Sequence, residues 1–169
     1  MRSRETDDTC EQIRRVLVIG YGNPLRSDDG LGQVIAERVA ESARSEAINV
    51  IVAHQLTPEL AEPISRATLV IFVDAAADMP AGRIKVAPVV ADAHGAAGSL
   101  GHHCDPPRLL ATAEKLYGRA PEAWAIFVGG ASWDLAESLS PAVERLVPRL
   151  LHDVELLIAV RLPAETSHA

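Results

Sequence analysis

Cysteine is scarce in this sequence: Cys10 and Cys104 are the only two, and they lie far apart. Two isolated cysteines exclude a disulfide framework and a zinc site built from paired CxxC thiolates. No apolar run of about 18 residues is present, so we expect no membrane span. The N-terminal stretch carries basic residues without an apolar segment behind them, which argues against a signal peptide. These absences favour a cytoplasmic protein.

Positive charge is also in short supply, with 16 Lys and Arg against 23 Asp and Glu and a formal net charge of −7. This balance argues against binding to nucleic acid or to an anionic membrane through bulk charge. Hydrophobic residues make up 48% of the chain, as in an ordinary globular domain. We expect one α/β domain over residues 15–162, loosely attached tails at 1–14 and 163–169, and a monomer or weak dimer.

Short apolar runs alternate with helical patterns along the chain. Runs of apolar and β-branched residues predict strands at 16–19, 49–53, 69–73, 83–88 and 124–128. Apolar spacing and Ser, Thr or Asp before Pro predict helices at 29–43, 57–66, 105–117 and 140–161, the last kinked at Pro148. Together they predict a single three-layer domain, in which helices cover both faces of a mostly parallel, five-stranded twisted sheet.

The loop after the first strand offers two acids, Asp28 and Asp29. A dinucleotide-binding loop would need glycine where Leu25 stands, and two carboxylates would repel a pyrophosphate, so nucleotide binding is disfavoured. One of the acids can cap the following helix, which leaves the other for chemistry. We choose Asp29 as the residue left for chemistry. Asp74, at the end of the third strand, is open to the same two interpretations.

A second group of candidates precedes the third helix, in a long loop with no apolar period. Adjacent histidines on an extended segment point to opposite sides, so we expect at most one of His102 and His103 to face a site. Imidazole and carboxylates together suit nickel or zinc. Cys104 as a nucleophile is the less favoured alternative, because it needs a lowered pKa that the sequence does not reveal.

Taken together, these residues resemble the [NiFe]-hydrogenase maturation endopeptidase family. The matching segments are VIGYGNPLRSDDGLG at 18–32, IFVDA at 71–75 and SLGHH at 99–103, with further likeness at 54–60 and 139–141. The resemblance covers residues 15 to 150 or so. The opening segment is fairly specific, whereas the later ones matter mainly through their order and spacing.

The resemblance implies a phosphorylase/hydrolase-like fold and an aspartic-type endopeptidase. Such an enzyme removes a C-terminal extension from the precursor of a [NiFe]-hydrogenase large subunit, and nickel arrives with that substrate. By the same resemblance, Asp29, Asp74 and His103 are the catalytic residues that engage the nickel. His103 is selected over His102 by counting back from Gly118, which closes the third helix in the family pattern. Asp29 departs from the family's Glu by one methylene.

Three questions stay open at this point. The metal could polarise the scissile carbonyl or activate water, or a carboxylate could act as general base. Gly129 and Gly130 could let a peptide approach the last strand closely, or could form a simple turn. The rival functions are a self-contained metallohydrolase with a small substrate, and a non-proteolytic, nickel-dependent maturation adaptor.

Overall fold

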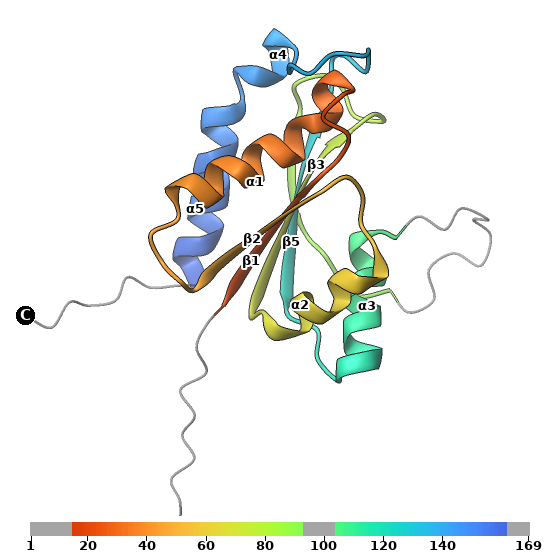
Figure 1. The fold of residues 1–169 in the computed structure, drawn as a ribbon, viewed down its shortest axis with the longest axis vertical. Helices are drawn as coiled ribbons and strands as arrows, with labels where there is room; N and C mark the ends of the chain where they lie inside the picture. The colour runs from red at the N-terminus through yellow and green to blue at the C-terminus, as the bar shows by residue number, and fades with distance from the viewer. Residues whose placement is uncertain (1–14, 93–103, 162–169) are drawn as a thin grey trace, which may run out of the picture.

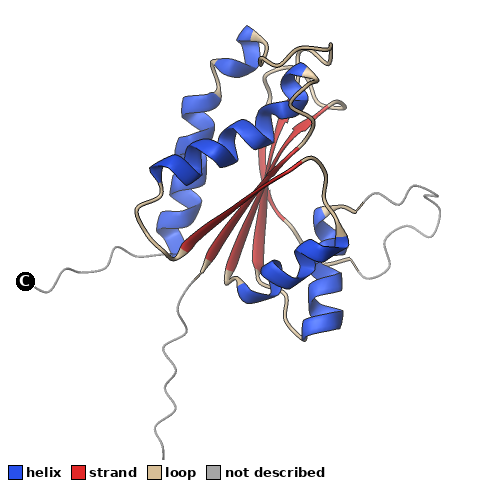
Figure 2. Cartoon of the chain, viewed as in Figure 1, coloured by secondary structure: helices blue, strands red, loops and turns tan. Residues whose placement is uncertain are grey.

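The computed structural model describes residues 15–92 and 104–161, and it contains one five-stranded sheet (Figures 1 and 2). The strands lie in the order β2-β1-β3-β5-β4, and only β4 runs antiparallel to its neighbour. Their bounds are β1 Val16–Tyr21, β2 Ile48–Ala53, β3 Leu69–Ala76, β4 Ile84–Pro88 and β5 Glu122–Gly129. The predicted five-stranded, mostly parallel sheet is confirmed.

Helices cover both faces of the sheet, which confirms the three-layer arrangement. One face is covered by α1 and α5, and the other by α2 and α3 (Figure 1). The α-helices are α1 Leu31–Ser42, α2 Ala61–Arg66, α3 Pro106–Tyr117, α4 Pro141–Glu144 and α5 Val147–Arg161. Two short 3-10 helices precede α1 and α2, namely η1 Ser27–Gly30 and η2 Pro58–Leu60.

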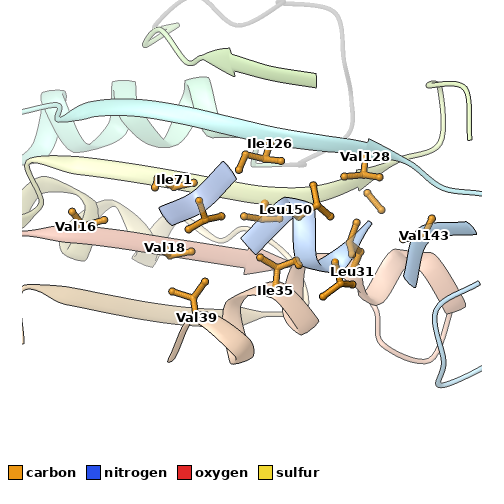
Figure 3. Packing of buried hydrophobic residues seen from close by; sticks show 14 of the residues in the cluster. Val16, Val18, Leu31, Ile35, Val39, Ile71, Ile126, Val128, Val143 and Leu150 are labelled. Atoms are coloured by element: carbon orange, nitrogen blue, oxygen red, sulfur yellow. The ribbon is translucent and has the colours of Figure 1, made fainter. Parts of the chain in front are cut away.

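The central strands are buried on both faces, so their side chains alternate between two cores. In β1, Val16 and Val18 face α1 and α5, whereas Leu17 and Ile19 face α2 and α3. Figure 3 shows the first core, where Leu150 of α5 joins side chains of α1 and of the strands. Burying a large aliphatic side chain contributes about 1.5–3 kcal/mol, so these two cores supply most of the driving force for this fold.

One detail of the predicted helices is wrong. The last helix is not one kinked rod, because it divides into α4 and α5 before Pro148. Pro148 therefore lies in the first turn of α5, where its missing N–H has no helical partner to lose. Thr57 is the N-cap residue before Pro58, as predicted, although its hydroxyl hydrogen-bonds the Glu59 carboxylate and not the backbone.

The two predicted tails, 1–14 and 163–169, lie outside the described residues. In the described part of the chain, no helix is both long and apolar enough to cross a membrane.

Candidate active site at the carboxyl edge of the sheet

The strand order creates a switch point between β1 and β3. From β1 the chain moves to β2 on one side, and it then crosses back to β3 on the other side. In open α/β sheets, ligands bind outside the carboxyl ends of the strands at such a point. Tyr21 is the last residue of β1, and Asp74 lies near the end of β3. Both residues therefore belong to the edge where a ligand is expected.

Tyr21 and Asp74 lie side by side at this edge. The register places Gly20 opposite Val73 in the adjacent parallel strand, so the residues that follow them are neighbours. The Tyr21 ring packs against the core beneath α2 and α3. Its hydroxyl donates a hydrogen bond to the Asp74 carboxylate. Tyr21 thus holds the carboxylate in place from the neighbouring strand.

Burial is the main influence on the ionisation of Asp74 and raises its pKa to about 7. Hydrogen bonds from the Tyr21 hydroxyl and the Ala75 backbone N–H oppose this shift, and the negative charge of Asp29 adds to it. Burial also raises the pKa of Tyr21, so its hydroxyl stays protonated and acts as the donor. A carboxyl group with a pKa near neutrality is suited to exchange protons with a substrate.

Asp29 lies in the short helix η1, which packs against β3, the strand that carries Asp74. It is partly exposed and accepts a hydrogen bond at Oδ2 from the Asn23 backbone N–H over 3.1 Å. Its charge makes the smallest of the contributions to the raised pKa of Asp74, and the two residues come close because η1 packs against β3. The structure thus brings together two of the three predicted site residues, although they are 45 positions apart in the sequence.

Two glycines let α1 lie directly on the strand ends and so carry η1 to the site. A Cβ atom on Gly32 would lie 2.3 Å from the Tyr21 carbonyl oxygen and 2.4 Å from the Val73 carbonyl oxygen. A Cβ atom on Gly20 would lie 1.9 Å from the Gly32 carbonyl oxygen. Side chains at these positions would force the helix away from the sheet. Gly32 provides the close helix packing for which a dinucleotide-binding loop uses its third glycine.

Asp28 is a structural cross-link. Its side chain is 0% exposed and accepts hydrogen bonds from the backbone N–H groups of Ala131 (2.7 Å), Ser132 (2.9 Å) and Ser140 (2.7 Å), and from the Ser140 hydroxyl (2.8 Å). Burial favours the neutral acid, but these four hydrogen bonds outweigh it and lower the pKa of Asp28.

The expectation that one of the two acids caps the helix is wrong, because the N-cap residue of α1 is Gly30 and no side chain caps it. Every hydrogen bond of the buried Asp28 carboxylate goes to the loop 131–140, so Asp28 serves the structure, and a chemical role for Asp29 stays a prediction.

The start of α3 also borders this site. Asp105 caps α3 as predicted, with its Oδ1 accepting from the Arg108 backbone N–H over 2.9 Å. Its negative charge makes the smallest contribution to the raised pKa of Tyr21, and the preceding residue, Cys104, packs against the same core cluster as Tyr21. Burial and then the charge of Asp105 raise the pKa of Cys104, which disfavours the thiolate that a nucleophile requires.

The third predicted residue, His103, lies outside the described residues, as does His102. Within 15–92 and 104–161, no three His, Cys, Asp or Glu side chains lie close enough together to hold a metal ion. The two described carboxylates, Asp29 and Asp74, are hard oxygen ligands that suit a divalent ion when further ligands are supplied.

Sequence reasoning missed two supporting residues, Tyr21 and Gln33. Gln33 is buried in α1, and its side-chain amide donates to the carbonyl oxygens of Gly22 (2.7 Å) and Ala53 (2.9 Å). These bonds tie the loop after β1 to the end of β2. Tyr21 could have been found from its position. It ends a strand that runs parallel to the strand of Asp74, and parallel strands bring their carboxyl ends to one edge.

No protein-family model and no curated protein matches this sequence. Solved structures do match. The hydrogenase maturating endopeptidase HybD from E. coli has a TM-score of 0.71 and 19% identity, covering 86% of this chain and 93% of HybD. The [NiFe] hydrogenase maturation protease HycI from Thermococcus kodakarensis KOD1 has a TM-score of 0.68 and 22% identity, covering 85% of this chain and 92% of HycI.

A third match is the hydrogenase 2 maturation peptidase from a Thaumarchaeota archaeon, with a TM-score of 0.65 and 24% identity, covering 87% of this chain and 99% of that protein. All three alignments span nearly the whole domain of either protein. This chain therefore has the fold of the solved [NiFe]-hydrogenase maturation proteases.

Proposed function

We propose that this chain is a cytoplasmic endopeptidase that removes a C-terminal extension from the nickel-loaded precursor of a [NiFe]-hydrogenase large subunit. The observation that carries the proposal is the approach of Asp29 to Asp74 at the switch point between β1 and β3. The shared fold supports the same class of reaction, since the solved structures that match are named as maturation endopeptidases and proteases.

Nickel enters this proposal as part of the substrate. Asp29 and Asp74 offer carboxylate oxygens to the ion from the side that the precursor leaves open, and His103 supplies an imidazole. Anchoring the ion in this way positions the tail that follows it, because a held substrate reacts with a large gain in effective concentration. The ion then supplies Lewis acidity next to the scissile bond. Recognition through the ion makes cleavage depend on nickel insertion.

Each carboxylate has a support that serves this role. The Tyr21 hydroxyl holds Asp74, and the Asn23 backbone N–H holds Asp29. Hydrogen bonds of this kind fix the orientation of a ligand before the substrate arrives. A cation bound between the two acids would neutralise the negative charge that they place at this edge.

The test is incubation of the purified chain with nickel-loaded and nickel-free precursor, followed by mass spectrometry of the precursor. We expect shortening at the C-terminus only with the nickel-loaded form. The neighbouring histidines provide a matched pair, because His103→Ala should slow cleavage strongly whereas His102→Ala should leave the rate near that of the wild type. A precursor of unchanged length would support the adaptor function. Stoichiometric metal copurifying with the chain would support a self-contained metallohydrolase.

A further inference from the structure

Two exposed leucines lie on neighbouring loops next to the candidate site. The side chain of Leu135, in the loop between β5 and α4, is 89% exposed, and that of Leu25, between β1 and η1, is 54% exposed. Burial of exposed leucines by a partner removes apolar surface from water and so favours association. We call these two residues the apolar rim.

Hydrogen bonds join the two loops that carry the apolar rim. The backbone N–H of Ala136 donates to the Leu25 carbonyl oxygen over 3.1 Å, and Arg26 forms a β-bridge with Ala136. Ser27 adds a backbone bond to the Ala136 carbonyl oxygen (2.8 Å) and a side-chain bond to the Ser138 carbonyl oxygen (3.1 Å). The backbones of the two loops thus lie side by side, which brings Leu25 and Leu135 into the same region of the protein.

The loops are also fixed to the rest of the protein. Trp133, two residues before Leu135, packs against the core cluster that faces α1 and α5. Asp28 joins η1 to the loop at Ala131. Ser27 adopts a φ of 49°, a conformation that costs free energy for any residue with a side chain and that persists because the surroundings impose it. A surface held this firmly loses little conformational entropy when a partner binds.

The apolar rim is linked through Asn23 to a predicted nickel-binding carboxylate. The backbone N–H of Leu25 donates to the Asn23 side-chain oxygen over 3.0 Å, and the backbone N–H of Asn23 donates to Asp29 Oδ2 over 3.1 Å. One residue, Asn23, therefore hydrogen-bonds to both the rim and the site. A protein segment that reaches Asp29 therefore comes close to the loop that carries Leu25.

We propose that the apolar rim is the docking surface for the precursor protein, and that Leu25 and Leu135 bind an apolar surface next to its C-terminal extension. The inference rests on the proposed function, since it assigns a binding surface to that reaction. Docking through apolar contacts adds affinity that is equal in the ground state and the transition state. Its loss therefore raises KM and leaves kcat unchanged.

The test compares the double variant Leu25→Gln/Leu135→Gln with the control Leu116→Gln/Leu156→Gln. The control leucines are 64% and 50% exposed and lie on α3 and α5. With nickel-loaded precursor, we expect the rim variant to raise KM by about tenfold or more, with kcat changed less than about twofold. The control should match the wild type in both constants, and all variants should have the melting temperature of the wild type.

Different results identify different failures. If the wild-type chain leaves the precursor uncleaved, the proposed function fails and the inference fails with it. If the wild type cleaves and the rim variant has an unchanged KM, only the docking surface is refuted. A wild-type dimer in light scattering that the rim variant dissociates, without a change in KM, would assign the rim to a second copy of this chain and refute the inference.

Discussion

Replacement of Asp28 by asparagine is the sharpest test of how the structure holds Asp29 in place. The carboxylate accepts one hydrogen bond at Oδ1 and three at Oδ2, all from the loop at 131–140. An asparagine can keep the three bonds at one oxygen, but its NH2 group then faces the Ser140 backbone N–H. The asparagine NH2 group and the Ser140 N–H are both donors, so this buried N–H is left without an acceptor.

The magnitude follows from these contacts. A hydrogen bond to a charged group contributes about 1.5–3 kcal/mol, and a buried donor left without an acceptor costs about 1–3 kcal/mol. Part of this loss is offset because asparagine no longer buries a charge. We expect Asp28→Asn to lower the free energy of unfolding by about 3 kcal/mol, equivalent to about 6–12 °C in Tm for a domain of this size.

Thermal denaturation provides the assay, with Asp78→Asn as the control because Asp78 is exposed. The control should shift the stability by less than about 0.5 kcal/mol. The difference between the wild type and Asp28→Asn should also shrink in acid. The folded state lowers the pKa of Asp28 below its ordinary value of 3.8, so its contribution is present above that pH and is lost below it. A variant as stable as the wild type at neutral pH would refute the cross-link.

Two further predictions concern Asp74. Because its pKa is about 7 in the folded state against an ordinary value of 3.8, the wild type should lose stability as the pH rises from about 4 to about 7. Asparagine does not ionise, so Asp74→Asn should not lose stability over this range. The Tm of the variant minus that of the wild type should therefore be larger at about pH 8 than at about pH 4. An equal difference at both pH values would contradict the raised pKa. Tyr21→Phe removes a hydrogen bond that lowers the same pKa, so the acid limb of the cleavage rate should move to higher pH. Tyr117→Phe, at a tyrosine 49% exposed, is the matched control, and an unmoved profile in both variants would argue against the Tyr21–Asp74 contact.

The central strands were predictable because buried strands consist of consecutive apolar residues. Val16, Leu17, Val18 and Ile19 are all buried, and a strand covered on both faces needs such an uninterrupted apolar run. The division of the last helix was less predictable. An apolar stripe continues through the residues on both sides of Pro148, so periodicity alone could not show that the chain turns before this proline.

The candidate site was predictable in part. Position after β1 and at the end of β3 made Asp29 and Asp74 candidates, because the carboxyl ends of parallel strands meet at one edge, but it was the family resemblance that joined them in one site. The sequence suggested different roles for Asp28 and Asp29 but could not establish them, since the hydrogen-bond partners of Asp28 lie 103 to 112 positions away. Contacts between such distant loops leave no periodic trace in the sequence.

The central claim is that Asp29 and Asp74 act together on the precursor, and a double-mutant cycle measures this directly. Initial rates of cleavage of nickel-loaded precursor would be compared for the wild type, Asp29→Asn, Asp74→Asn and the double variant. We predict that each single change lowers the rate by about a hundredfold or more, and that the double variant is no slower than the slower single variant. Losses that multiply, or single variants that cleave at the rate of the wild type, would contradict the account.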